Sequence, residues 1–160
     1  MEENRVFSDD GREELPQDGN AVPATDVEKY LLFVSDGLLF GAAASYIVEI
    51  ITNHPITSLP LVPSYVRGII KLRGQIIPIV DIRRLLGQEP ASQDCIIILN
   101  IHDTMLGVLV DTVQKMIDIH SKSILPSPHK DHDGLVSGMC SLAEGQTMLV
   151  FDCTQLLHQS

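Results

Sequence analysis

Metal-ligating side chains gather in one short stretch of the chain. Residues 129–134 read His-Lys-Asp-His-Asp-Gly and so bring two imidazoles and two carboxylates close together. Zinc and other divalent cations use these side chains as ligands. Metal sites usually draw their ligands from rigid elements that hold each one in place, and the sequence offers this loop no obvious remote ligand. The stretch therefore predicts a solvated polar loop and no metal site. A metal-dependent enzyme built on this loop is the minor alternative.

The other reactive side chains form no catalytic arrangement. Asp81 and Asp152 each end an apolar run and precede a short segment with room for a helical turn, so they predict helix N-caps and not paired catalytic carboxylates. The phosphate-binding G-x-x-x-x-G-K-[ST], the dinucleotide-binding G-x-G-x-x-G, G-x-S-x-G and H-E-x-x-H motifs do not occur. The three cysteines are odd in number, lack C-x-x-C spacing and lie in apolar runs, which predicts buried free thiols: Cys95, Cys140 and Cys153. We expect no enzyme activity, cofactor or metal.

One strand-turn-strand pattern dominates the middle of the chain, at residues 65–86. Two short runs rich in β-branched residues flank Arg73-Gly74, which predicts a hairpin whose turn uses the freedom of Gly74 to adopt positive φ. Pro78 lacks an N–H group, so its strand should lie at a sheet edge or carry a bulge. Three basic residues cluster here in a chain of net charge −10, which predicts a surface that meets another protein: Arg67, Lys71 and Arg73.

The same pattern returns later in the chain. Residues 75–86 align without a gap on residues 146–157, and residues 40–50 resemble residues 106–116. Shorter matches lie between them in the same order: Leu59-Pro60 with Leu125-Pro126, and Val66–Gly68 with Val136–Gly138. Such spacing indicates two copies of one small β unit.

Turn residues divide the rest of the chain into short segments. Hairpins are predicted at residues 29–44 and 95–110, and a linker at residues 87–94. Residues 45–51 and 111–117 are predicted as helical turns, capped by Ser45 and by Asp111 with Gln114. Many short strands with little helix are typical of all-β barrels or sandwiches.

Composition limits the kind of protein. At 160 residues and 44% hydrophobic residues, the chain can bury one core or two small packed halves. The acidic balance argues against nucleic-acid binding, and no apolar run approaches the ~20 residues of a membrane span. We expect a soluble cytoplasmic protein. Residues 1–27 hold eight acidic residues against Arg5 and Arg12, which predicts a disordered acidic tail, with an electrostatic arm for a basic partner as the alternative.

Several motifs together resemble the CheW-like chemotaxis coupling proteins. The similarity extends from Glu28 to Leu157 in the family's order and spacing. Its most specific parts are Pro63–Gly68, Leu72–Gly74, Ile77–Arg83, Gly107–Val113 and the Pro126–Pro128 loop.

The resemblance implies a fold and a function. The fold is a pair of five-stranded SH3-like β-barrels with short helical turns, the first at about residues 28–87 and the second at about 94–157, with exchange of strands between them left open. The implied function is that of a non-enzymatic adaptor that couples the CheA histidine kinase, through its regulatory domain, to the cytoplasmic tips of methyl-accepting chemoreceptors at arrays beneath the inner membrane. Other CheW-like domains are further candidate partners. The alternative is a variant that competes in the array without activating the kinase.

The resemblance also implies two sets of contact residues. The receptor-binding set is Ile47, Glu49, Arg67, Gly68 and Arg73. The kinase-binding set is Gly107, Val108 and Gly138. The chain departs from the family pattern at Lys71, which replaces a frequent asparagine, at Ala42–Ala44, which replace bulkier residues, and in the acidic tail.

Overall fold

The computed structural model describes residues 26–127 and 134–159. Residues 1–25 of the predicted acidic tail and residues 129–133 of the predicted polar loop lie outside this described part. The first strand begins at Val27, the last residue that the sequence assigned to the tail.

Short strands make up most of the described chain, as the sequence predicted, and the helical elements are three to six residues long. The strands are β2 (Val27–Ser35), β3 (Leu38–Ala43), β4 (Ile47–Thr52), β5 (Val66–Leu72), β6 (Gln75–Asp81), β7 (Cys95–Ile101), β8 (Thr104–Val110), β9 (Thr112–His120), β10 (Leu125–Pro126), β11 (Val136–Ser141) and β12 (Thr147–Phe151). The helical turns are η3 (Ala44–Tyr46), α1 (Ile82–Leu85), η4 (Ser121–Ser123), η6 (Ala143–Gly145) and η7 (Cys153–His158).

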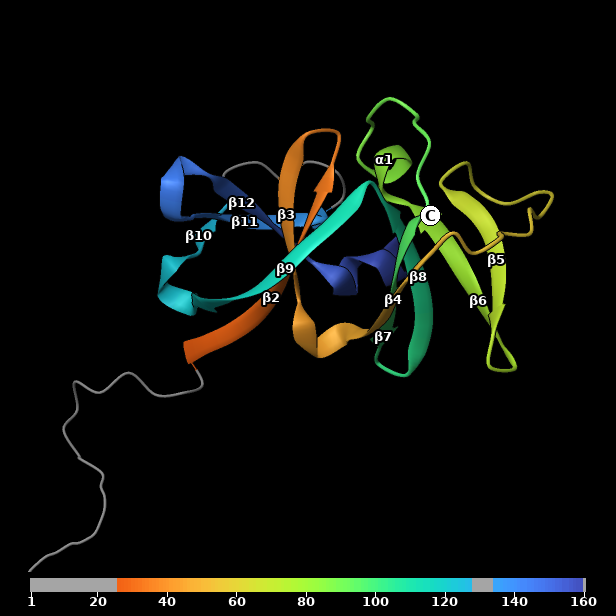
Figure 1. Cartoon of the computed structure of the whole chain (residues 1–160), viewed down its shortest axis with the longest axis horizontal. Coiled ribbons are helices and arrows are strands. Elements are labelled where there is room, and N and C mark those ends of the chain that lie inside the picture. Colours follow the sequence, from red (N-terminus) through yellow and green to blue (C-terminus); the bar gives the residue numbers. More distant parts are fainter. Residues whose placement is uncertain (1–25, 128–133, 160) are drawn as a thin grey trace, which may run out of the picture.

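Two sheets lie side by side and curl into two barrels (Figure 1). The central barrel has the strand order β4-β7-β8-β6-β5, and the terminal barrel has the order β10-β11-β12-β3-β2-β9. The terminal barrel thus has six strands instead of the predicted five, because the two-residue strand β10 pairs with β11.

The barrels exchange strands across the boundaries predicted at residues 28–87 and 94–157, an arrangement that the prediction left open. The hairpin β2–β3 pairs with β9 and β12, and the hairpin β7–β8 pairs with β4 and β6. The chain crosses between barrels at η3 and again at Asp111, between β8 and β9. Each sequence copy therefore contributes its first hairpin to one barrel and its remaining strands to the other barrel. This exchange links the two halves of the chain.

The strand register shows the duplication directly. Ile79 lies opposite Gly107 in the parallel pair β6–β8, and Val150 lies opposite Gly41 in the parallel pair β12–β3. In the sequence repeat, Ile79 aligns with Val150 and Gly41 aligns with Gly107. Both copies also have a bulge before the glycine of β5 or β11.

The prediction of helical turns at residues 45–51 and 111–117 is wrong. Apart from η3, these segments form the edge strands β4 and β9. Their β-branched residues fit a pleated strand better than a helix, and each segment finds a free hairpin edge to pair with. The side chain of Asp111 bonds to Arg83 and to the N–H of Asp36, so it caps no helix.

Other local predictions are confirmed. Asp81 accepts a hydrogen bond from the N–H of Arg83 at 2.9 Å, and Asp152 accepts one from the N–H of Thr154 at 3.1 Å. The prediction that the strand of Pro78 lies at a sheet edge or carries a bulge is wrong, because β6 is an inner strand and the neighbouring bulge lies in β5. Although β6 is an inner strand, it pairs with β8 only from Ile79 onward, so Pro78 faces no second ladder.

Three apolar clusters hold the molecule together. The largest lies between the barrels and includes the packed rings of Phe33, Phe40 and Phe151. One smaller cluster fills each barrel, around Ile79 in the central barrel and Met148 in the terminal barrel. The three cysteines are buried and free, in agreement with the prediction. Within the described residues, no helix has the length and apolar character needed to cross a membrane.

Candidate functional site

An ion pair joins the two edges of the central barrel. Arg73, in the β5–β6 turn, donates from Nη2 to Oε2 of Glu49 at 3.2 Å and from Nη1 to the other carboxylate oxygen. Glu49 lies on β4, the strand at the opposite edge of the sheet. The Arg73 hydrogen bond is the main reason that the pKa of Glu49 is lowered. The structure thus brings together two of the predicted receptor-binding residues that are distant in sequence.

A bulge in β4 turns the side chain of Glu49 toward Arg73. Ile47 lies opposite Leu99, which belongs to the cluster between the barrels, whereas Glu49 lies opposite Ile98, which belongs to the cluster inside the central barrel. In a regular strand, positions 47 and 49 would face the same side. The extra residue, Val48, rotates Glu49 away from the interface between the barrels and toward Arg73.

Arg67 and Gly68 lie together at a second bulge, in β5. Arg67 reaches Oδ2 of Asp81 at 3.3 Å, and the Asp81 carboxylate is almost fully buried. Gly68 has φ 146°, and an added Cβ would lie 2.0 Å from the carbonyl oxygen of Thr57. Only glycine fits there, so Gly68 shapes the local backbone and offers no side chain to a partner.

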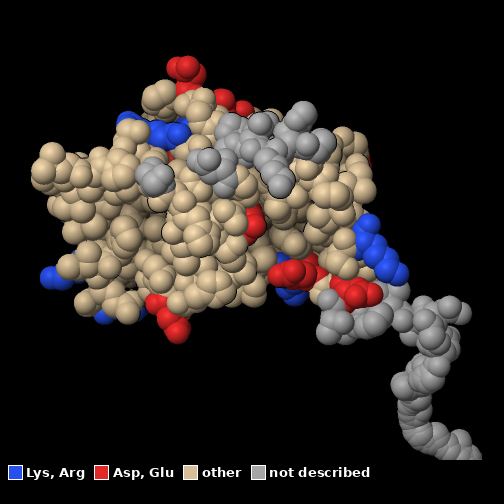
Figure 2. All heavy atoms as spheres, turned by 180° about the vertical axis from the view of Figure 1, so that it is seen from behind, with Lys and Arg blue, Asp and Glu red and all other residues tan. Residues whose placement is uncertain are grey.

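Exposed apolar residues accompany these polar groups. On the outward face of β5–β6, Lys71 pairs with Ile76, whose side chain is 64% exposed. Val48 and Ile50 are exposed on β4. Figure 2 shows that the side of the molecule opposite to Figure 1 is largely uncharged, with charged residues mostly near its rim. Apolar surface with a few charges is typical of a protein-binding face.

The predicted kinase-binding residues lie inside the fold. Val108 is 2% exposed and belongs to the cluster between the barrels. A Cβ on Gly107 would lie 2.4 Å from Cδ1 of Ile79, and a Cβ on Gly138 would lie 2.7 Å from the carbonyl oxygen of Leu125. The structure therefore does not assemble these three residues into one exposed surface.

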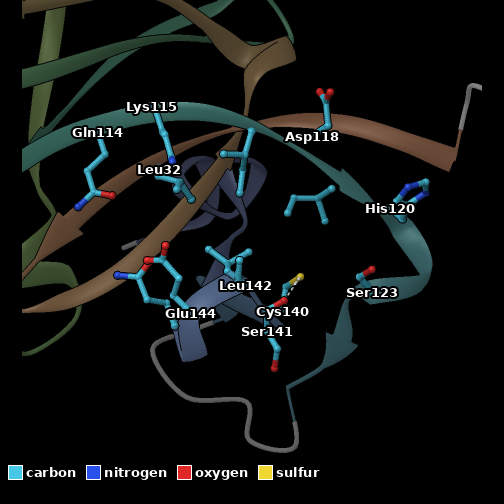
Figure 3. Close-up of a pocket in the computed structure, with 14 residues that line it drawn as sticks. Leu32, Gln114, Lys115, Asp118, His120, Ser123, Cys140, Ser141, Leu142 and Glu144 are labelled. Atoms are coloured by element: carbon cyan, nitrogen blue, oxygen red, sulfur yellow. Dashed lines mark hydrogen bonds between the residues drawn. The ribbon is translucent and has the colours of Figure 1, made fainter.

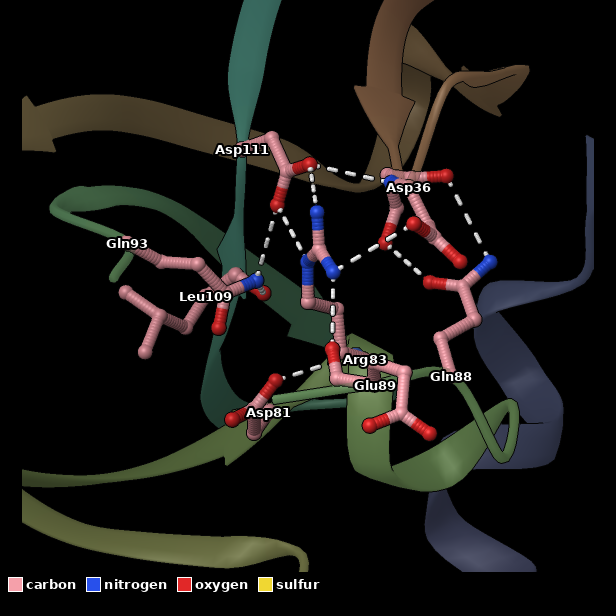
Figure 4. A network of polar contacts seen from close by, with 9 residues as sticks. Asp36, Asp81, Arg83, Gln88, Glu89, Gln93, Leu109 and Asp111 are labelled. Carbon is pink, nitrogen blue, oxygen red and sulfur yellow. Dashed lines mark hydrogen bonds and ion pairs between the residues drawn. The ribbon is translucent and has the colours of Figure 1, made fainter. Parts of the chain in front are cut away.

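A polar network that the sequence did not predict lies where the chain crosses between the barrels (Figure 4). Arg83 donates to both carboxylate oxygens of Asp111, at 2.9 and 2.6 Å, and to the carbonyl oxygen of Glu89 at 2.7 Å. Asp111 also accepts from the N–H of Asp36 at 2.9 Å and from Nε2 of Gln93 at 3.3 Å. The hydrogen bond from Arg83 is the main reason that the pKa of Asp111 is lowered. The sequence signals were that Arg83 ends the family-like Ile77–Arg83 run and that Asp111 lies in the family-like Gly107–Val113 run.

Among residues 26–127 and 134–159, no three His, Cys, Asp or Glu side chains are placed to hold a metal ion. The buried thiols are unsuited to nucleophilic attack, since burial raises the pKa of Cys153 to about 12.

Comparisons with known proteins agree with the fold. Residues 29–160 match the family model described as a CheW-like domain. The chain is 38% identical over 77 residues to the chemotaxis protein CheW of Rhizobium meliloti, a match that covers 46% of this chain and 50% of that protein. A match to CheW of Bacillus subtilis has 30% identity and covers 82% of this chain and 88% of the relative. A match to the probable chemotaxis protein CheW of Rhizobium etli has 34% identity over 82 residues and covers 53% of that protein, so the chain spans about half the length of both rhizobial relatives.

A solved structure shares the architecture. The scaffolding protein TtCheW from Thermoanaerobacter tengcongensis superposes with a TM-score of 0.77 at 27% identity, covering 83% of this chain and 94% of that one. This likeness confirms the predicted pair of SH3-like barrels. The extent of the family match and the shared two-barrel architecture lead to one assignment: the chain belongs to the CheW-like domain family.

Proposed function

We propose that the chain is a non-enzymatic adaptor that couples the cytoplasmic tips of chemoreceptors to a CheA-type histidine kinase. The observation that carries this proposal is the Glu49–Arg73 pair, held across the edges of the central barrel beside exposed apolar residues, in a CheW-like fold. Its relatives are named as chemotaxis proteins, and the solved relative is described as a scaffolding protein. The place of action is the cytoplasm, at receptor arrays beneath the inner membrane.

The receptor contact belongs on the central barrel. Glu49 and Arg73 supply complementary charges, and Ile47 and Arg67 flank them on β4 and β5. An exposed ion pair adds little to folding stability, and the Arg73 side chain is 71% exposed. Charges at the rim of a binding face instead act on partner choice and association. Gly68 contributes by allowing β5 to approach Thr57 closely.

The kinase contact has a different basis. Gly107, Val108 and Gly138 are buried, so their contribution to kinase binding comes from packing that shapes the barrels. The partner we propose is the regulatory domain of the kinase, and other CheW-like domains are further candidates.

Substitution of the pair tests the receptor contact. We expect Glu49→Ala and Arg73→Ala each to lower receptor-dependent kinase activation at least tenfold and the melting temperature by less than about 3 °C. Lys29→Ala is the matched control, because Lys29 forms an exposed ion pair with Asp118 at 2.9 Å on the terminal barrel. Full activation by both folded variants would contradict the proposed receptor face, and equal loss in the control would show a general effect of surface charge.

A further inference from the structure

A groove opens in the wall of the terminal barrel. Its volume is about 420 Å³, and it lies between β9 and the β11–β12 turn. Leu32, Ile117 and Leu142 give it an apolar lining. In Figure 3, Lys115 projects from β9 and Glu144 from the opposite wall. No ion pair joins Lys115 to Glu144 among the described residues.

Lys115 and Glu144 occupy the positions in the terminal barrel that correspond to those of Glu49 and Arg73 in the central barrel. Glu49 follows the bulge of β4, between the pairs Ile47–Leu99 and Ile50–Ile97. Lys115 occupies the same place in β9, between the pairs Val113–Phe33 and Met116–Leu31.

The turns that carry the other charges correspond as well. Arg73 has φ 50° and precedes Gly74 at φ 81°, and Glu144 has φ 67° and precedes Gly145 at φ 78°. The terminal barrel therefore repeats the Glu49–Arg73 site with the signs of the charges exchanged. In the central barrel the two side chains meet, whereas in the terminal barrel a groove separates them.

Among residues 26–127 and 134–159, backbone groups at the groove lack strand partners. Within this part of the chain, β9 is the last strand of its sheet and pairs with β2 alone. On the other wall, β10 pairs with Gly138 and Met139 of β11 and stops before Cys140. An unpaired strand edge beside an apolar groove accepts an extended peptide, which adds backbone hydrogen bonds and places side chains in the groove.

We infer that the occupant is the chain's own segment Arg5–Asp9. Its sequence is Arg-Val-Phe-Ser-Asp, so a basic and an acidic residue flank two large apolar side chains. Arg5 complements Glu144, Asp9 complements Lys115, and Val6 and Phe7 cover the apolar lining. The segment contains no proline or glycine, and valine and phenylalanine favour extended backbone.

The chain enters the fold beside this groove. Val27 of β2 lies opposite His120, which lines the groove. Residues 10–26 connect this point to the segment, and a polar linker of that length has an average end-to-end distance of about 20 Å. Such a linker gives an effective concentration in the millimolar range, so a contact with a dissociation constant of about 1 mM is populated. The acidic tail therefore carries a ligand for the protein's own groove and competes with any other strand for the edge of β9.

Amide chemical shifts of the full-length ¹⁵N-labelled chain test the contact. We expect Phe7→Ala to shift the amide signals of Ile117 and Leu142, whereas the matched tail variant Leu15→Ala leaves them unchanged. We expect Lys115→Glu to release the segment and Lys115→Glu with Asp9→Lys to restore the wild-type pattern around Leu142. A synthetic peptide of residues 1–12 should bind the Phe7→Ala chain at least tenfold more tightly than the same peptide carrying Phe7→Ala.

Three results would overturn the inference. The first is that the amide signals of Ile117 and Leu142 have the same chemical shifts in the wild type and in Phe7→Ala. The second is failure of the Asp9→Lys exchange to restore the pattern in a folded Lys115→Glu chain. The third is a groove signal that weakens on dilution, because the occupant would then be a second copy. None of these measurements involves the kinase or a receptor, so the outcome is separate from that of the adaptor proposal.

Discussion

Replacing Asp111 should destabilise the protein far more than replacing Asp118, although each carboxylate accepts a hydrogen bond from a basic residue at 2.9 Å. Asp111 lies where the chain crosses between the barrels, and its side chain is 20% exposed. Asp118 lies on β9 with a side chain that is 59% exposed. The two aspartates therefore form a matched pair that differs mainly in burial and in the number of hydrogen bonds.

The expected magnitudes follow from these contacts. Asp111→Ala removes two hydrogen bonds from Arg83, one from the N–H of Asp36 and one from Gln93. It also leaves the Arg83 side chain, which is 11% exposed, with the more distant carboxylate of Asp36 at 3.5 Å. Removing one partner of a mostly buried ion pair lowers the unfolding free energy by about 3 kcal/mol. This value is at the lower end of the usual range, because the pair is partly exposed to solvent. Loss of the exposed Lys29–Asp118 pair costs about 0–1 kcal/mol.

Thermal and urea unfolding measure the difference. For a domain of this size, the melting temperature falls about 2–4 °C per kcal/mol, so Asp111→Ala should lower it by about 6–12 °C. Asp118→Ala should lower it by no more than about 4 °C. Arg83→Ala combined with Asp111→Ala should cost less than the sum of the single changes, because both remove the same contact. Equal and small shifts for both aspartates would refute the view that this network holds the barrels together.

Three further outcomes are expected. Gly107→Ala should cost about 1–3 kcal/mol of unfolding free energy, because the methyl group would meet Cδ1 of Ile79 at 2.4 Å, and Ile79→Val, which removes that atom, should recover part of the loss in urea unfolding. The stability difference between the wild type and Asp111→Ala should be constant from pH 7 to pH 5 and shrink below about pH 4. A carboxyl whose folded pKa lies below its ordinary 3.8 stabilises the fold above that value and loses this effect as the pH falls through the folded pKa. Thiol reagents should modify Cys153 only after unfolding, as followed by mass spectrometry in increasing urea, since burial raises its pKa to about 12.

Local chemistry was readable from the sequence. The Arg73-Gly74 turn and the hairpin at residues 29–44 were predicted from turn residues that adopt positive φ readily. Asp36-Gly37 and Arg73-Gly74 both have positive φ in the structure. Asp81 and Asp152 were recognised as caps from their place after an apolar run. The duplication and the family membership also came from residue order alone, since each copy keeps its turns, glycines and apolar runs at nearly the same spacing.

The tertiary structure decided which strand edges meet. The sequence of residues 45–51 and 111–117 fits a helical turn or a strand, and these segments became strands because the exchanged hairpins offered them an edge. The same long-range pairing set the bulge that turns Glu49 toward Arg73. It also brought Arg83 to Asp111, the residue at which the chain returns to the terminal barrel. Turns and caps depend on neighbours in sequence, whereas bulges, partner strands and buried ion pairs depend on surfaces that exist only after distant segments have packed.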